Sequence, residues 1–237
     1  MKDLEKIKEN IKNQLSKKLG KEIDKNNLIL MNEGEYINAA VFRYKDENLD
    51  LTIKDFSTSP WILKNTLGRI FVKREGNSLK KLEENPSVTK NIIFLSKYTL
   101  AFDFIKGKPL KSFLDNSIEK EFFLELEKNV IEMHKKDIVH LDLRNLGNII
   151  VGENYYPYLI DFQSCISIKW LPQKLKDLIK GADITGIYKC WSRKCKEPLD
   201  EERIKYFNDF QKIRKVWIFK GYPLKRLKEN LKNKFKK

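Results

Sequence analysis

The stretch DIVHLDLRNLGNIIVGENYYPYLIDF, residues 137–162, is the most informative part of the chain. An apolar pair leads into a polar run that begins at His140 and ends at Asn148, and three apolar residues follow. After a turn, a second β-favouring run ends in Asp161. The pattern predicts a polar loop held between short strands, with Asp142, Asn148 and Asp161 at or near the strand ends.

Two carboxylates and an amide in this arrangement are the groups that phosphoryl transfer requires. One carboxylate, Asp142, would orient or accept the proton of an acceptor hydroxyl. The second carboxylate, Asp161, and the amide of Asn148 offer the oxygen ligands that Mg²⁺ prefers beside nucleotide phosphates. The expected cofactors are therefore ATP and Mg²⁺.

These motifs and their order resemble the protein-kinase-like superfamily, and the match extends from about residue 28 to residue 190. The resemblance implies an α+β, bilobal fold with a small antiparallel-sheet N-lobe and a mostly helical C-lobe. The N-terminal lobe is expected to span residues 1–105, including an extra N-terminal helix, and the C-terminal lobe residues 106–237, including a basic tail. The runs His-Leu-Asp-Leu-Arg-Asn, Asn-Ile-Ile-Val and Asp-Phe-Gln are similar to those of small bacterial lipopolysaccharide core kinases, such as the 3-deoxy-D-manno-octulosonic acid kinases.

The polar loop departs from the superfamily pattern in its spacing. The metal-binding Asn normally follows the catalytic Asp by five residues, whereas Asn148 follows Asp142 by six. We interpret this as a one-residue expansion, accommodated by backbone freedom at Gly147. Asn145 is the competing metal ligand, and Asn148 is preferred because it directly precedes a strand.

The expected nucleotide-binding ion pair consists of Lys54 and Glu75. Lys54 lies in an apolar, β-branched run, so that its ammonium group can point only one way once its stem is buried. Glu75 lies on the apolar stripe of a predicted helix and needs a cation there. By resemblance this is the pair that positions the α and β phosphates. Glu83 and Glu84 are alternative partners.

Other nucleotide contacts are implied only by the resemblance. Gly34 lies in the turn that would cover the phosphates, although an ordinary hairpin explains it equally well. In FDFIKGKPL, which resembles a hinge, Phe102 would line the back of the pocket. The Asp103 carbonyl and the Ile105 amide would then hydrogen-bond adenine.

The resemblance also assigns supporting roles in the second lobe. His140 would brace the polar loop from the core, and Arg144 would neutralise the transferred phosphoryl group. Asp183 would hold the loop backbone or simply cap a helix. Gln163 stands where protein kinases usually have Gly, which restricts the backbone and argues against a phosphorylation-controlled activation segment.

Hydrophobic periodicity predicts the main helices. A helix over residues 3–19 should end at Gly20 and pack on the small lobe, and residues 61–84 should be helical with a break near Gly76. Asn116 and Ser117 are expected to cap a helix over residues 118–135. A helix over residues 198–220 is expected to precede the tail.

Composition limits the remaining options. The formal charge is +15, and from Ser192 onward sixteen Lys or Arg residues face six Asp or Glu residues. Without a run of about twenty apolar residues or a signal peptide, a cytoplasmic location is expected. The tail could contact anionic membrane or merely aid solubility, and nucleic acid is an improbable partner because no recognition motif accompanies the charge. Three cysteines, expected to be reduced, and two histidines leave too few ligands for zinc.

The sequence therefore predicts an ATP-dependent phosphotransferase that acts on a hydroxyl of a lipopolysaccharide core sugar or lipid-linked glycan. Two alternatives stay open: an atypical RIO-like protein serine kinase, and a nucleotide-binding scaffold without catalytic activity.

Overall fold

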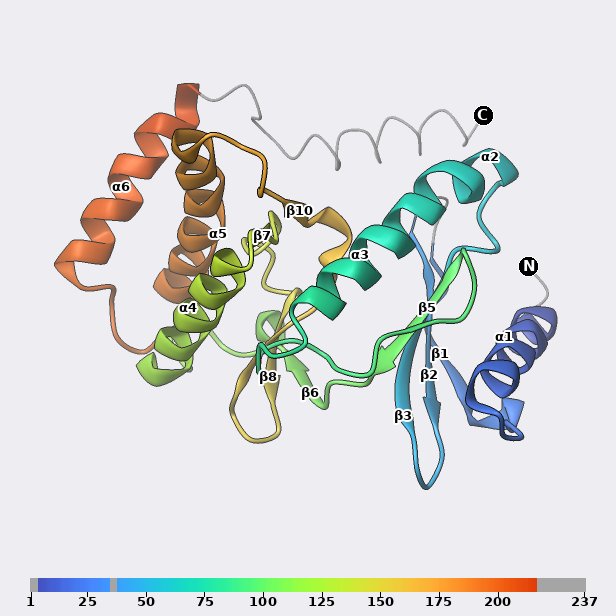
Figure 1. The fold of residues 1–237 in the computed structure, drawn as a ribbon. Coiled ribbons are helices and arrows are strands. Elements are labelled where there is room, and N and C mark those ends of the chain that lie inside the picture. Colours follow the sequence, from blue (N-terminus) through green and yellow to red (C-terminus); the bar gives the residue numbers. More distant parts are fainter. Residues whose placement is uncertain (1–3, 35–37, 217–237) are drawn as a thin grey trace, which may run out of the picture. The chain divides into compact units, whose positions relative to one another are not determined.

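The computed structural model describes residues 4–34 and 38–216. These residues form two compact units. Unit 1 contains residues 4–80 and 90–104, and unit 2 contains residues 81–89 and 105–216 (Figure 1). The predicted basic tail and the predicted end of the last helix lie outside the described residues.

Unit 1 is built on an antiparallel sheet of five strands in the order β1-β2-β3-β5-β4. The strands are β1 (Leu28–Asn32), β2 (Ala40–Lys45), β3 (Asp50–Asp55), β4 (Ile93–Phe94) and β5 (Thr99–Asp103), and a short 3-10 turn, η1 (Lys25–Asn27), precedes them. Side chains alternate between the two faces of such a sheet. One face therefore carries Phe42 and Ile53, which are opposite each other in the β2–β3 register, and the other carries Val41 and Lys54.

Helix α1 (Leu4–Leu19) covers the first of these faces. Its Ile11 and Leu15 are fully buried in one cluster with Phe42 and Ile53. The helix ends at Gly20, which adopts a φ of +65°, and the Gly20 amide donates to the Ser16 carbonyl at 2.9 Å. The predicted N-terminal helix, its end and its packing on the sheet are confirmed.

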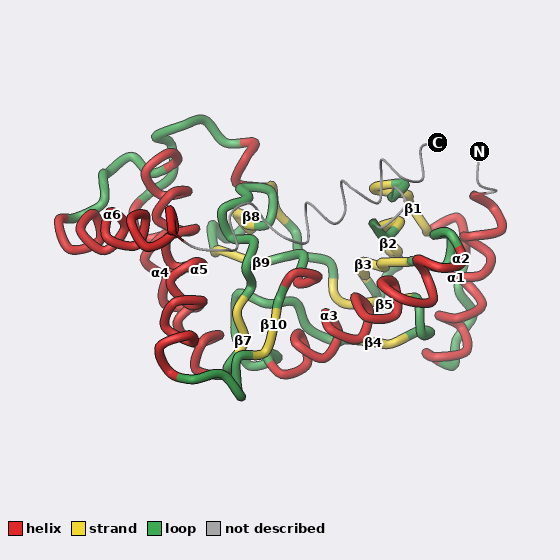
Figure 2. The backbone as a smooth tube through the Cα atoms, turned by 90° about the horizontal axis from the view of Figure 1, so that it is seen from above, coloured by secondary structure: helices red, strands yellow, loops and turns green. Residues whose placement is uncertain are grey.

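The helical stretch after β3 begins with α2 (Trp61–Leu63) and a π-helical turn, η2 (Lys64–Gly68), and continues as α3 (Arg69–Lys81). Helix α3 lies beside β4 and β5 (Figures 1 and 2). The predicted break near Gly76 is wrong, because α3 runs through it. Glycine is needed there for packing, since a Cβ at Gly76 would lie 2.3 Å from Phe94 Cζ.

Unit 2 contains two small antiparallel sheets. One has the order β6-β8-β9 and the other pairs β10 with β7. Their bounds are β6 (Gly107–Pro109), β7 (Ile138–Val139), β8 (Ile149–Gly152), β9 (Pro157–Leu159) and β10 (Ile166–Ser167), with 3-10 turns η3 (Leu110–Ser112) and η4 (Phe162–Ser164). The predicted polar loop thus lies between β7 and β8, as the sequence indicated.

Residues 81–89 belong to unit 2 because their polar groups bond there. Asn85 Nδ2 donates to the Asn129 carbonyl at 2.8 Å, and Ser87 Oγ donates to the Pro157 carbonyl at 2.7 Å. The Leu159 amide in turn donates to the Ser87 carbonyl at 2.8 Å.

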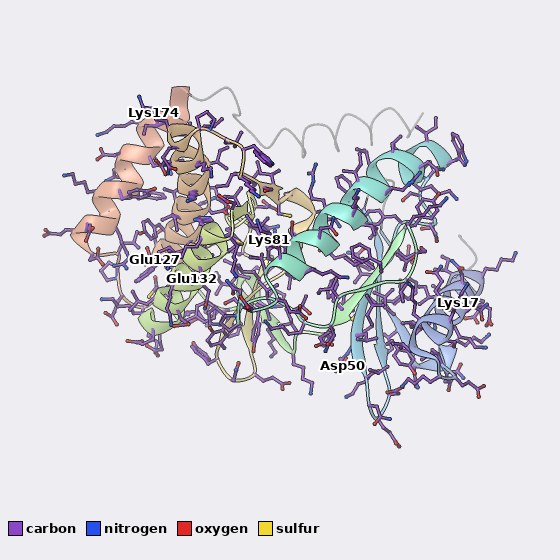
Figure 3. The ribbon with its side chains drawn as sticks, in the orientation of Figure 1. Lys17, Asp50, Lys81, Glu127, Glu132 and Lys174 are labelled. Carbon is purple, nitrogen blue, oxygen red and sulfur yellow. The ribbon has the colours of Figure 1, made fainter. Side chains whose placement is uncertain are left out.

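Three helices form the rest of unit 2: α4 (Lys120–Lys135), α5 (Gln173–Lys194) and α6 (Glu201–Val216). The predicted inner stripe of α4 is confirmed, since Phe122, Leu126, Val130 and Met133 are all buried. Glu127, labelled in Figure 3, joins the three helices. It accepts a hydrogen bond from Tyr188 on α5 and forms an ion pair with Arg203 on α6 at 2.5 Å.

The predicted caps of α4 are wrong. The residue before the helix is Glu119, whose side chain makes no capping hydrogen bond. Ser117 Oγ instead donates to the Leu114 carbonyl at 2.7 Å. Helix α5 supplies the hydrogen-bond acceptor for the backbone of this stretch. The Ser117 and Ile118 amides both donate to the Lys194 carbonyl at 2.9 Å. No helix in the described part of the chain is long and apolar enough to cross a lipid bilayer.

Candidate functional site

Lys54 and Glu75 form a buried ion pair in unit 1. Lys54 Nζ lies 2.7 Å from Glu75 Oε1, and their side chains are only 10% and 1% exposed. Strand β3 supplies the lysine, and α3 supplies the glutamate between the buried side chains of Phe71 and Leu79. Glu84, an alternative partner in the sequence, pairs instead with Lys136 at 2.8 Å. Removing either member of such a pair leaves an uncompensated buried charge.

Other side chains share the sheet face of Lys54. Val41 is directly opposite Lys54, and Phe102 is directly opposite Thr52. Val41 and Thr52 are half-buried and therefore accessible beside the lysine. Sequence analysis missed both, although the two-residue alternation of β2 and β3 could have indicated them.

Gly34 occupies the turn between β1 and β2 with a φ of +66°. Its amide donates to Asn32 Oδ1 at 2.9 Å, and a Cβ there would lie 2.5 Å from the Ala39 carbonyl. The positive φ and the close approach to Ala39 thus require glycine without any ligand. A role in covering phosphates stays a prediction.

The hinge residues differ in how their backbone groups are used. The Asp103 amide donates to the Lys90 carbonyl at 3.0 Å, and Asp103 is paired with Leu51 in the sheet. The Ile105 amide has no hydrogen-bond acceptor among the described residues. This donor is therefore available to a ligand, and adenine binding at the hinge stays a prediction.

In unit 2, Asp142 and Asn148 are joined across the loop of residues 140–148. Asn148 Nδ2 donates to Asp142 Oδ2 at 2.9 Å and to the Asp142 carbonyl at 3.1 Å. Asn145 Nδ2 donates to Asn148 Oδ1 at 3.2 Å. Because the Asn148 nitrogen serves Asp142, its Oδ1 is the atom that can accept from Asn145 or bind a metal ion.

The expected reason for tolerating the longer loop is wrong. Gly147 is not among the residues with positive φ. The extra residue is accommodated by turns around Asn145: its amide donates to the Asp142 carbonyl at 3.3 Å and its carbonyl accepts from the Asn148 amide at 2.9 Å. The Gly147 amide donates to Asn145 Oδ1 at 3.0 Å. A Cβ at Gly147 would approach that oxygen to 3.2 Å, so glycine is used for close approach.

Asp161 is placed by its neighbour Ile160. The Ile160 amide donates to the Asn148 carbonyl at 3.0 Å, and its carbonyl lies 3.0 Å from His140 Nε2. Asp161 then adopts a left-handed backbone with φ +65°, which is uncommon for a residue other than glycine. His140 is fully buried, and its ring packs against Phe162 at 4.7 Å between centroids. His140 thus braces the loop from the core.

Asp183 on α5 holds the start of the loop. Its Oδ2 accepts from the His140 amide and its Oδ1 from the Leu141 amide, both at 2.7 Å. Leu141 needs this support because its φ is +67°. His134 Nε2 lies 3.1 Å from the same Asp183 Oδ2. Of the two roles considered for Asp183, the contacts fit holding the loop backbone and not capping a helix.

Two further residues of α5 support the loop and were missed by sequence analysis. A Cβ at Gly186 would lie 3.1 Å from the Arg144 amide nitrogen, so α5 packs directly on the loop backbone. Cys190 Sγ donates to the Leu143 carbonyl at 3.3 Å, and burial raises the pKa of its thiol to about 12. No local signal in the sequence marks either contact, since both join segments more than forty residues apart.

The Arg144 side chain packs against Gly186 on α5. A Cβ at Gly186 would lie 3.2 Å from Arg144 Cγ. Its guanidinium group forms no hydrogen bond or ion pair with another residue in the described ranges. A cation two residues after Asp142 is therefore available to an anionic ligand.

Burial raises the pKa of the Asp142 carboxyl above its ordinary value, and the nearby charge of Asp161 raises it further. The His140 ring and hydrogen bonds from Asn148 and Asn145 act in the opposite direction. Asp142 is therefore a stronger proton acceptor than an exposed aspartate, which suits a general base.

A separate surface pocket of about 370 Å³ on unit 2 is lined by residues of α4, α5 and α6, including His134, Tyr188 and Tyr206. None of the predicted site residues lines it. Its link to the 140–148 loop is the hydrogen bond from His134 to Asp183. No group of three or more His, Cys, Asp or Glu residues within residues 4–34 and 38–216 could hold a metal ion.

Comparison with known proteins supports the fold. No family model matches the chain. The chain is 29% identical over 114 residues to the EKC/KEOPS complex subunit BUD32 of Enterocytozoon bieneusi (strain H348), which covers 42% of this chain and 55% of that protein. The chain thus spans about half the length of this curated relative.

Solved structures with a similar fold include two of one kinase. The Rio2 kinase from Chaetomium thermophilum matches with a TM-score of 0.53 and 14% identity, covering 77% of this chain and 71% of that one. Its complex with ADP, Mg²⁺ and phosphoaspartate matches with a TM-score of 0.51 and 14% identity, covering 77% and 69%. Neither is a lipopolysaccharide kinase, so that part of the resemblance stays a prediction. The chain has a protein-kinase-like α+β fold, with an antiparallel sheet in unit 1 and a mostly helical unit 2.

Proposed function

We propose that this protein is an ATP- and Mg²⁺-dependent phosphotransferase that transfers the γ-phosphoryl group to a hydroxyl. The observation that carries the proposal is the hydrogen-bonded Asp142–Asn148 pair, in a loop that Asp183 holds by two backbone amides. A half-buried carboxylate with a raised pKa is typical of a catalytic group and is not required of a non-catalytic scaffold.

In this proposal each site residue has one task. Asp142 orients the acceptor hydroxyl and takes its proton, and Arg144 neutralises charge on the phosphoryl group in transit. Lys54, held by Glu75, contacts the α and β phosphates. Positioning and charge neutralisation carry most of the catalysis, because the transition state is loose.

Mg²⁺ fits the donors that the chain offers. Asn148 Oδ1 and the Asp161 carboxylate are both oxygen donors, as this ion prefers. Mg²⁺ commonly uses only one or two protein ligands and completes its shell with phosphate and water. Two donors are therefore sufficient, and the bound ion would offset the phosphate charge.

For the acceptor, we favour a protein serine hydroxyl, as in the RIO-like alternative, over a sugar of a lipid-linked glycan. The support is the likeness to Rio2 kinase in fold and the partial match to BUD32 in sequence. A glycolipid acceptor, with contact to an anionic membrane, is the second candidate. It is supported by the basic tail, because each Lys or Arg near such a surface contributes about 1 kcal/mol to membrane binding.

The test is phosphoryl transfer from γ-labelled ATP by the purified full chain, with Mg²⁺ or with EDTA, to separate pools of protein and of glycolipid in anionic vesicles. Mg²⁺-dependent label in the protein pool, absent with Asp142→Asn, supports the favoured acceptor. Label only in glycolipid selects the second candidate. Hydroxylamine-labile label on the enzyme itself would indicate transfer to one of its own aspartates, a group named in the Rio2 complex. Tight ATP binding without transfer to any pool would overturn the proposal.

A further inference from the structure

The segment Ile166–Leu171, between η4 and α5, lies beside strand β7, which leads into the 140–148 loop (Figures 1 and 2). Its strand β10 pairs with β7, and the Ile168 amide donates to the Asp137 carbonyl at 2.9 Å. Ile168 is fully buried in a cluster with Val139, and Leu171 packs against the same cluster. The backbone of this segment is therefore held in place from both ends.

Trp170 projects from this anchored segment into solvent. Its side chain is 87% exposed, the highest value among the large hydrophobic residues that the structure describes. Its neighbours show that the segment could bury apolar side chains, because Ile168 is fully buried and Leu171 half-buried. Tryptophan is enriched among the residues that carry most of the binding energy at protein interfaces.

The segment that carries Trp170 and the residue before Asp142 pack on one apolar cluster. Leu141, the residue before Asp142, packs on the Val139–Ile168 cluster, and so does Leu171, the residue after Trp170. One small apolar cluster thus fixes the backbone next to Asp142 and next to Trp170.

The residue before Trp170 is a lysine that has no ion-pair partner within the described residues. Lys169 Nζ lies 5.2 Å from the centroid of the Trp170 ring, within the range of a cation–π contact. Neither Lys169 nor Arg144 forms an ion pair with a residue of the described ranges. Lys176 differs, because it pairs with Asp137 at 3.0 Å.

We propose that Trp170 and Lys169 form an acceptor-recognition site, which selects protein segments carrying an acidic residue and an apolar or aromatic side chain near the phosphorylated hydroxyl. Trp170 would pack on the apolar side chain, and Lys169 would pair with the acid. Single-stranded nucleic acid fits less well, because it uses several aromatic side chains in succession, and Trp170 is the one exposed aromatic in the described segment. This inference rests on the proposed function.

The test compares peptide acceptors of equal length that contain one serine and either acidic or basic flanking residues. With Trp170→Ala we expect KM for the acidic peptide to rise about tenfold or more, while ATP hydrolysis without acceptor is unchanged. Trp170→Phe should retain most of the affinity. With Lys169→Glu the preference should shift toward the basic peptide, and the wild-type preference should weaken as salt is raised.

Matched controls exist in unit 1. Trp61 is also a highly exposed tryptophan, at 74%, and Lys97 lies over the Tyr98 ring at 5.1 Å much as Lys169 lies over Trp170. Trp61→Ala and Lys97→Glu should leave KM for every acceptor unchanged.

Binding can also be followed without catalysis. Acceptor peptide should shift the fluorescence of the wild-type protein, and the shift should vanish in Trp170→Phe. If phosphoryl transfer occurs but Trp170→Ala and Lys169→Glu keep the wild-type KM and peptide preference, the recognition site is wrong and the proposed function stands. If the Trp170 variants affect glycolipid and not peptide acceptors, the site recognises a sugar and the inference is also wrong. If no acceptor is phosphorylated, the proposed function itself fails.

Discussion

Asp183 Oδ1 accepts a 2.7 Å hydrogen bond from the amide of Leu141, a residue held at φ +67°. A leucine in the left-handed region is strained, and such a conformation persists only where its surroundings hold it. Because Leu141 directly precedes Asp142, the backbone that presents Asp142 is supported by this carboxylate. Asp183 is fully buried, and it is therefore a positioning residue that acts through the loop backbone.

The first prediction is that Asp183→Ala lowers both activity and stability. The variant leaves the amides of His140 and Leu141 without this acceptor, and an unsatisfied group that is buried, as the His140 amide is, costs about 1–3 kcal/mol. The free energy of unfolding, measured with urea, and the turnover on a saturating acceptor should both fall. Asp183→Asn, which keeps one acceptor oxygen, should lose less of each.

A surface aspartate provides the control. Asp209 is exposed and pairs only with Lys212, three residues along α6, so Asp209→Ala should change the free energy of unfolding by no more than about 0.5 kcal/mol. Full turnover by Asp183→Ala would show that Asp142 is oriented by other contacts.

The second prediction concerns the buried Lys54–Glu75 pair. Lys54→Met or Glu75→Gln alone should destabilise the protein by about 3–5 kcal/mol, because the remaining partner loses its counter-charge. The double variant Lys54→Met/Glu75→Gln should lose less than the sum of the two, because both charges of the pair are removed together. Nucleotide affinity should fall in every variant that lacks Lys54.

The half-exposed Arg43–Asp50 pair on the same sheet is the matched control. Its atoms lie 2.6 Å apart, yet the side chains are 24% and 20% exposed. A double-mutant cycle with Arg43→Met and Asp50→Asn should therefore give a clearly smaller coupling energy. Additive effects in the Lys54–Glu75 cycle would mean that the two side chains contribute independently.

Much of this architecture was predictable from the sequence because its signals are local. Helical periodicity indicated α1 and α4, and alternation around Lys54 indicated β3. Glu75 was identifiable as the partner of Lys54 because a carboxylate on an apolar helix face requires a cation. The 140–148 loop was recognisable because its polar residues are framed by two apolar runs.

The errors arose where a distant segment decides the local structure. Gly76 suggested a helix break, but its role is contact with Phe94. Ser117 suggested a cap, but its amide bonds to the Lys194 carbonyl. The contacts of Gly186 and Cys190 with the 140–148 loop likewise depend on tertiary packing that no local pattern encodes.

The third prediction separates the two asparagines of the loop. Asn148→Ala should weaken Mg²⁺-dependent nucleotide binding strongly, because it removes both the Oδ1 donor and the hydrogen bond to Asp142. Asn145→Ala should have a smaller effect, because Asn145 is exposed and only orients Asn148 at 3.2 Å. Calorimetric titration of ATP with and without Mg²⁺ measures the difference. The opposite ranking would assign the metal to Asn145, and two negligible effects would favour the non-catalytic alternative.

The fourth prediction uses the raised pKa of Asp142, which couples activity and stability to pH in opposite ways. As a base, Asp142 must be ionised, so turnover should decrease as pH falls through its folded-state pKa, which is raised above the ordinary aspartate value. Stability should respond in the other direction. A carboxyl whose pKa is higher in the folded than in the unfolded protein binds its proton more tightly when folded, so its stabilising contribution is complete below the unfolded pKa and is lost as pH rises through the folded pKa.

Asp142→Asn removes this titration and keeps an oxygen that can accept from Asn148. Turnover should fall by about 10² to 10⁴, the usual range for a positioned proton acceptor, while nucleotide binding survives. At neutral pH the variant should be more stable than the wild type, because it buries no charge beside Asp161, and the two should converge as the buffer is brought below the ordinary aspartate pKa. Urea midpoints across pH, measured beside turnover, check both results. A variant that is less stable at neutral pH would mean that the ionised carboxylate is stabilised by its hydrogen bonds, and unchanged turnover would remove Asp142 from the chemistry.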